Sequence, residues 1–74
     1  MLSTPEGLGK FIKKERKAMS LTQAELALTS GTGMRFISDL ENGKSTCQIG
    51  KTLTVLKTLG LRLTLSSPHS PGGG

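Results

Sequence analysis

Few side chains in this 74-residue chain could support catalysis or bind a metal ion. His69 is the single histidine and Cys47 the single cysteine, and no two candidate ligands have the spacing of a metal site. No nucleophile has a base beside it in a recognisable arrangement. Gly7 and Gly9 do not form a phosphate-binding loop, because no strand is predicted before them. We therefore expect no catalytic residue, no metal and no cofactor, and a protein that is not an enzyme.

Basic side chains are the remaining candidates for chemistry, and their chemistry is the binding of anions. Ten lysines and arginines outnumber five aspartates and glutamates, which gives a net charge of +5. This excess favours a nucleic acid or an anionic membrane surface as partner. The only aromatic residues are Phe11 and Phe36, which disfavours single-strand binding by base stacking. A membrane-bound first helix is also disfavoured, because its apolar face is too narrow for strong insertion.

Helices are expected to position these residues. A first helix begins at Pro5 with Thr4 as its cap, and a second begins with a capping box formed by Thr22 and Glu25. The second helix ends near Gly31, where a positive φ is expected and any Cβ would clash. A third helix is predicted over about residues 33–42 with Thr32 as cap, and a fourth from a cap at Thr46 to Leu59.

The fourth helix carries two apolar stripes, which suggests one for the core and one for a partner. One stripe contains Ile49, Leu53 and Leu56, and the other contains Val55 and Leu59. Residues 61–65 alternate strictly and predict a half-buried strand. We expect a helical domain over 1–60, a dimerisation strand over 61–66 and a disordered tail over 67–74.

No apolar run is as long as a transmembrane helix, and the first residues lack the pattern of a signal peptide. With Cys47 unable to form an internal disulfide, we expect a protein of the reducing cytoplasm.

A helix-turn-helix is the most informative expectation, and it spans residues 23–43. Ala27 allows the two helices to cross closely, and Gly31 lies in the turn between them. Leu26, Ile37 and Leu40 would attach the unit to the core. On spacing alone, an ordinary helical hairpin remains an alternative.

Residues 22–27 (TQAELA) and 40–44 (LENGK) resemble the signature of the lambdoid phage repressors and their relatives, the XRE family. The resemblance covers residues 8–61 and departs at Ser30, where relatives usually have an apolar residue. It implies an all-α, lambda-repressor-like bundle of four to five helices whose third helix enters the major groove of DNA.

This resemblance implies roles for individual side chains. Arg35 is the best candidate base reader, because its guanidinium matches O6 and N7 of guanine. Asp39 either accepts from a cytosine amine or orients Arg35, and Met34 either touches a thymine methyl group or acts as a spacer. The expected base contacts are Met34, Arg35, Ser38 and Asp39, and the expected phosphate contacts are Gln23, Thr32 and Lys44. Relatives also imply a salt bridge between Arg16 and Glu41, although two solvated charges are the alternative.

Residues 35–44 and the alternating end at 61–65 are further similar to HipB-like antitoxins. Those proteins end in a strand that pairs with its copy, repress their own operon and bind a HipA-type serine/threonine kinase toxin. The resemblance implies a homodimer, a palindromic double-stranded operator and a HipA-like kinase toxin as partner, and we expect no membrane. The expected dimer interface consists of Val55, Leu59, Leu61, Leu63 and Leu65. The alternatives are a plain phage-type repressor without a protein partner and a protein-interaction adaptor.

Overall fold

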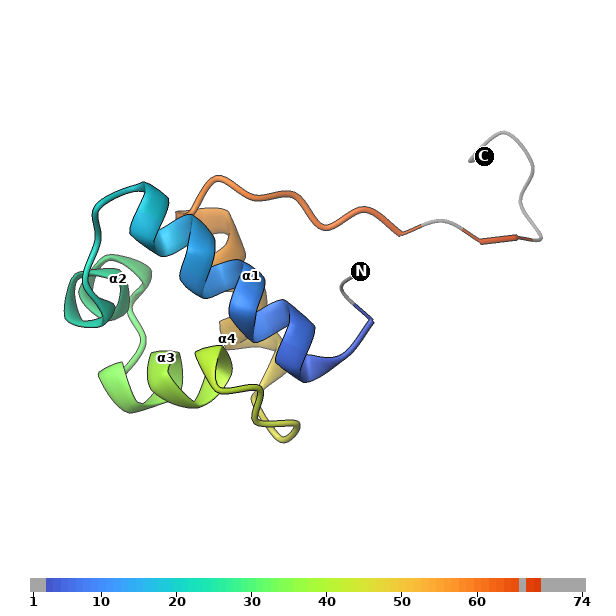
Figure 1. The fold of residues 1–74 in the computed structure, drawn as a ribbon, viewed down its shortest axis with the longest axis horizontal. Helices are drawn as coiled ribbons and strands as arrows, with labels where there is room; N and C mark the ends of the chain where they lie inside the picture. Colours follow the sequence, from blue (N-terminus) through green and yellow to red (C-terminus); the bar gives the residue numbers. More distant parts are fainter. Residues whose placement is uncertain (1–2, 66, 69–74) are drawn as a thin grey trace.

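The computed structural model describes residues 3–65 and 67–68, and this part of the chain contains four helices (Figure 1). They are α1 (Pro5–Ala18), α2 (Gln23–Ser30), α3 (Met34–Glu41) and α4 (Ile49–Thr58). The all-α prediction is confirmed, with helix number at the lower end of the expected range. Most of the predicted tail, including His69, lies outside the described residues.

The first two helices begin at the predicted caps. The Thr4 hydroxyl accepts a hydrogen bond from the Gly7 N–H at 3.0 Å. Thr22 and Glu25 form the complete capping box, with the side chain of each accepting from the backbone N–H of the other at 3.0 and 2.8 Å. These bonds satisfy backbone donors that a helix start leaves without partners.

The predicted caps of the other two helices were wrong. Gly33, which has no side chain to cap with, is the N-cap of α3. Gln48 is the N-cap of α4, and its side chain makes no capping hydrogen bond. The Thr32 hydroxyl lies 2.9 Å from that of Ser30 instead. Thr46 precedes the first residue of α4 by three positions, so its hydroxyl is too early in the chain to cap it.

All four helices end in the same type of hydrogen-bonded turn, in which the chain reverses through a left-handed residue. The left-handed residues are Ser20, Gly31, Gly43 and Gly60, with φ angles of 59°, 71°, 81° and 73°. In each turn the next backbone N–H bonds to a carbonyl five residues earlier, for example Lys44 to Asp39 at 3.0 Å. The positive φ expected at Gly31 is therefore present. A Cβ there would meet no atom of the described chain within 4 Å, so the cost of substitution is backbone strain and not collision.

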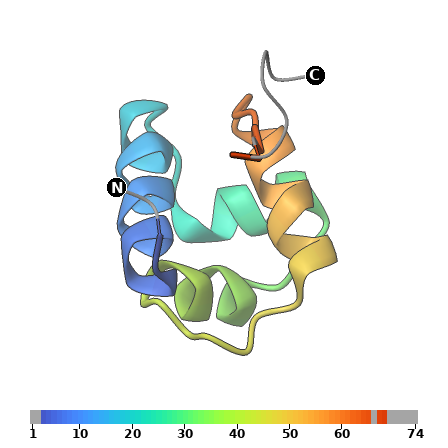
Figure 2. The same cartoon turned by 90° about the vertical axis from the view of Figure 1, so that its right-hand side faces the viewer.

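The helices surround one small core. In Figure 2, α1 and α4 stand on opposite sides, α2 lies between them and α3 crosses below. The side chains that fill the centre are Ile12, Leu26, Ala27, Ile37, Leu40, Val55, Leu56 and Leu59. Met19 is half exposed, because it lies at the C-cap of α1.

One feature of the predicted partner surface requires correction. Val55 and Leu59 are buried in the core of the single chain, so neither offers a stripe to a partner. The exposed apolar side chains of α4 are Ile49 and Leu53. Residues 61–65 leave the bundle as an extended arm without an assigned strand (Figure 1). The residues that the structure describes contain no strand beside this arm, so its pairing with a second copy stays a prediction.

Among the described residues, none of the helices combines the length and hydropathy required to cross a bilayer.

Candidate nucleic-acid interface

The unit formed by α2, its turn and α3 has the predicted helix-turn-helix geometry. Gly31 reverses the chain after α2, and Thr32 and Gly33 lead directly into α3. Ala27 and Ile37 are buried where the two helices meet the core. Ser30 was the one departure from the expected pattern, and its buried hydroxyl is satisfied by the Leu26 carbonyl oxygen at 2.7 Å. A polar residue is therefore accommodated here without an unsatisfied group.

The outer side of α3 presents two long side chains. Met34 is 57% exposed, and Arg35 beside it is also exposed. Within the part of the chain that the structure describes, Arg35 makes no hydrogen bond or ion pair, so its planar set of donors is available to a ligand. Ser38, one turn later on the helix, is half buried. The exposed side of α3 therefore carries a positively charged side chain, with a less accessible hydroxyl one turn further along.

Asp39 pairs with Lys44 and not with Arg35. Its Oδ2 lies 3.4 Å from the Lys44 Nζ, and both side chains are solvent-accessible. Among the described residues no side-chain hydrogen bond or ion pair joins Asp39 to Arg35, and the contact of Asp39 with a base stays a prediction. Both charges also act on the nearby Cys47. Burial raises the pKa of the Cys47 thiol, Asp39 raises it further and Lys44 opposes this effect.

Gln23 is the first residue of α2, where the helix dipole and free N–H groups favour an anion. Its side chain is held in place, because Nε2 donates to Glu41 Oε1 at 3.0 Å. One amide N–H and the amide oxygen stay outside this bond. The contact links the start of α2 to the end of α3 and fixes the orientation of a candidate phosphate ligand.

Arg16 and Glu41 form the buried ion pair beneath α3. Arg16 Nε and Nη2 donate to the two Glu41 oxygens at 2.6 and 3.0 Å, and each residue is only 6% exposed. The third donor, Nη1, reaches the Leu21 carbonyl oxygen at 2.7 Å. The pair therefore joins α1, the loop after it and α3.

Both members of this pair remain charged. The hydrogen bond to Glu41 raises the pKa of Arg16 above its ordinary value despite burial. Burial is the largest influence on the Glu41 carboxyl and raises its pKa, but several favourable interactions together outweigh it. These are the hydrogen bonds from Arg16 and Gln23 and the positive charges of Arg16 and Lys13, and they leave the pKa of Glu41 below its ordinary range.

Gly9 is a positioning residue that the sequence analysis did not identify. It is buried where α1 crosses the end of α3, and an added Cβ would lie 2.5 Å from the Leu40 oxygen and 2.6 Å from that of Glu41. Only a residue without a side chain allows this approach. A glycine inside a helical pattern was the available signal, because glycine weakens a helix unless packing requires it.

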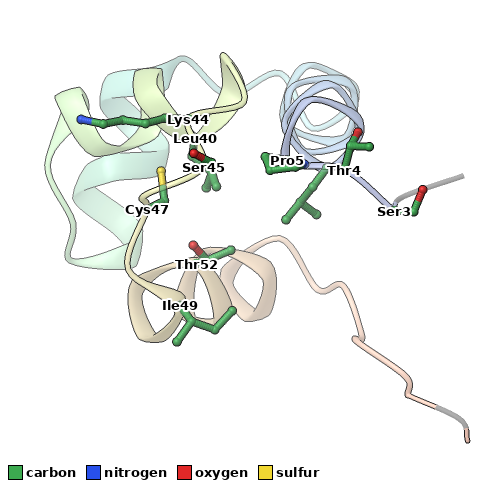
Figure 3. A pocket seen from close by; sticks show the side chains of 10 residues that line it. Ser3, Thr4, Pro5, Leu40, Lys44, Ser45, Cys47, Ile49 and Thr52 are labelled. Atoms are coloured by element: carbon green, nitrogen blue, oxygen red, sulfur yellow. The ribbon is translucent and has the colours of Figure 1, made fainter.

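A cavity of about 250 Å³ lies between the start of α1, the loop after α3 and the start of α4 (Figure 3). Leu8, Leu40 and Ile49 form apolar walls, and Cys47 lies at one side. Among the described residues there is no buried side-chain polar atom without a hydrogen-bond partner and no cluster of three metal-ligating side chains. Arg35 on the exposed side of α3 and Gln23 at the start of α2 remain the candidate ligand-binding groups.

Comparisons with known proteins agree with this geometry. The sequence pattern of a helix-turn-helix family, HTH_3, matches residues 12–65. An uncharacterised HTH-type transcriptional regulator, y4mF of Sinorhizobium fredii (strain NBRC 101917 / NGR234), is 48% identical over 67 residues, which are 90% of this chain and 88% of that protein.

Two solved structures are also similar to this chain. One is described as a HipA-HipB-O2-O3 complex and the other as a HipB-O4 20mer complex. Each matching chain is 28% identical with a TM-score of 0.82, and the match covers 92% of this chain and 96% of that one.

Proposed function

The chain belongs to the helix-turn-helix family HTH_3, whose members include DNA-binding transcriptional regulators, and we propose that it is a homodimeric, HipB-like repressor of a palindromic operator. It reads bases with α3 and binds phosphates at the start of α2. A HipA-like kinase toxin is its protein partner, and the reducing cytoplasm is its place of action.

The observation that carries this proposal is an unpaired arginine on a rigidly held helix. Arg35 lies in the first turn of α3, exposed and without a partner among the described residues. The far end of the same helix is fixed by the buried ion pair of Arg16 with Glu41. A base-reading side chain has to be presented by a scaffold that does not move, because each useful contact depends on sub-ångström placement.

Other site residues have supporting roles in this proposal. Gln23 binds a phosphate through its free amide N–H and the N-terminal dipole of α2. Lys44 binds a second phosphate, and Thr32 contributes its hydroxyl, which is shared with Ser30 in the free chain. Met34 and Ser38 contact base edges beside Arg35.

The extended arm supplies the dimer contact. Leu63 and Leu65 are 57% and 85% exposed, and Leu61 is packed against the core. Burying such a leucine fully stabilises by about 1.5–3 kcal/mol, and an unpaired strand leaves its backbone groups without ladder partners. Antiparallel pairing with the same arm of a second copy satisfies both requirements. Two α3 helices would then face half-sites about 34 Å apart.

Binding isotherms with Arg35→Ala test the proposal. On a duplex selected from a random pool, we expect a loss of about 1–3 kcal/mol per contact and relaxed preference at one base pair of each half-site. Lys57→Ala is the matched control, because it removes an exposed positive charge from the last turn of α4. If Arg35→Ala and Lys57→Ala weaken all sequences equally, Arg35 is not a base reader.

The kinase partner is tested separately. Similarity to a chain in a HipA-HipB complex supports this part of the proposal. If the chain is an antitoxin, a kinase encoded beside it will co-purify with it and be less toxic when the two are co-expressed. A protein that binds its operator but no product of its own operon is a plain repressor. A protein that binds its partner but no duplex is an interaction adaptor.

A further inference from the structure

Asp39 and Lys44 are joined through both their backbone and their side chains. The Lys44 backbone N–H donates to the Asp39 carbonyl oxygen at 3.0 Å, and the Lys44 Nζ lies 3.4 Å from Asp39 Oδ2. Gly43, with φ 81°, turns the chain so that Lys44 returns beside α3. The pair therefore follows from the way the helix ends, and the backbone bond keeps the two residues together.

This pairing places a negative charge where a DNA-binding surface is otherwise positive. Asp39 follows Arg35 by one helical turn, so the two side chains project from the same side of α3. A carboxylate there repels phosphates and the acceptor-rich edge of guanine. Its contact with Lys44 also offsets one of the positive charges available for phosphate binding.

We propose that Asp39 determines specificity by weakening the binding of non-cognate DNA. On a duplex without a suitable base, Lys44 stays paired with Asp39, and the carboxylate receives no hydrogen bond from the DNA. Where the half-site presents cytosine, its N4 amine donates to Asp39, and Lys44 is released to bind a phosphate. Base recognition and phosphate binding are thereby coupled through one ion pair. This inference rests on the proposed binding of DNA through α3.

Titration of two duplexes at several salt concentrations tests the proposal. One duplex carries the selected operator, and the other has a scrambled sequence of equal length and composition. For Asp39→Asn we expect scrambled-duplex affinity to rise about two- to fivefold per protomer, the range of an exposed ion pair. The salt dependence should steepen by about one phosphate contact, and the ratio of operator to scrambled affinity should fall at least tenfold. Glu15→Gln is the matched control, because the Glu15 side chain makes no hydrogen bond or ion pair within the described residues.

Lys44→Ala, made in the wild type and in the Asp39→Asn background, gives the second readout. We expect it to reduce scrambled-duplex affinity more in the Asp39→Asn background, where Lys44 is no longer paired. Equal effects of Asp39→Asn and Glu15→Gln, or equal losses from Lys44→Ala in both backgrounds, would overturn the proposal while leaving DNA binding intact. A wild-type protein with no salt-dependent affinity for any duplex would overturn the proposed function, and this inference with it.

Discussion

Replacing Gly9 by alanine changes the free energy of unfolding in two opposite ways, through helix propensity and through steric overlap. Alanine favours a helix interior by about 1 kcal/mol over glycine, so helix propensity alone predicts a more stable protein. The new Cβ would lie 2.5 Å from the Leu40 oxygen, whereas ordinary contacts begin at 3.4 Å, so α1 and α3 must separate by about 0.9 Å. The obstructing atoms are backbone atoms that cannot rotate away. Overpacking against atoms that cannot yield lies in the upper part of the usual range, about 2–3 kcal/mol, so after the gain in helix propensity we expect a net loss of about 1–2 kcal/mol.

Urea denaturation measures this difference, and Gly50→Ala is the matched control. Gly50 is also in a helix, α4, but an added Cβ meets nothing within 4 Å among the described residues. We expect Gly50→Ala to be neutral or to stabilise by up to about 1 kcal/mol. Gly9→Ala should lower the melting temperature by about 4–16 °C and also weaken operator binding, because α3 is displaced. If Gly9→Ala is as stabilising as Gly50→Ala, the inferred close approach of α1 and α3 is wrong.

Three further changes have defined outcomes. Ser20→Gly should raise the free energy of unfolding by about 0.5 kcal/mol, because relief of the backbone strain at φ 59° exceeds the entropy cost of glycine. Urea denaturation measures this change, and a lower free energy of unfolding would contradict the reasoning. Glu41→Gln should destabilise by about 3 kcal/mol at pH 7, since it leaves Arg16 buried without its counter-charge. Because the folded pKa of Glu41 is lowered, the pair contributes fully above about pH 4.3 and its contribution is lost as pH falls through the folded pKa. The difference between wild type and Glu41→Gln should shrink on acidification, and a constant difference would refute this account. Leu63→Pro should yield folded monomers in sedimentation experiments and abolish tight binding to the palindrome, whereas a persistent dimer would exclude the arm as the interface.

Local signals in the sequence were sufficient for the first two helices. Thr4 and Thr22 each precede a clear helical pattern, and their hydroxyls accept from backbone groups only three residues away. The same reasoning failed at Thr32, because the hydroxyl of Ser30 competes for it. Whether a hydroxyl caps a helix depends on which hydrogen-bonding group lies closest to it, and the residue type alone does not determine this.

Contacts between distant segments were harder to predict. The sequence does not show which of the two stripes of α4 faces the core. In the structure Val55 and Leu59 of one stripe are buried together with Leu56 of the other, where α4 packs against α2. Gly9 gives no indication that the end of α3 lies against it, since the two are about thirty residues apart in the chain. The ion pair of Asp39 with Lys44 depends on the left-handed turn at Gly43, and helical periodicity does not indicate the direction of a side chain beyond such a turn.

The bond from Arg16 Nη1 to the Leu21 carbonyl oxygen gives the buried pair a fixed polarity. If arginine and glutamate exchanged positions, their mutual attraction would survive, but a carboxylate at position 16 would face a carbonyl that needs a donor. Position 41 is constrained in the same sense, because Glu41 accepts from the Gln23 amide. During divergence, Arg16 and Glu41 can therefore be replaced together by apolar residues, whereas an exchange of arginine and glutamate between the two positions is disfavoured. Related sequences should contain the pair in this order or not at all.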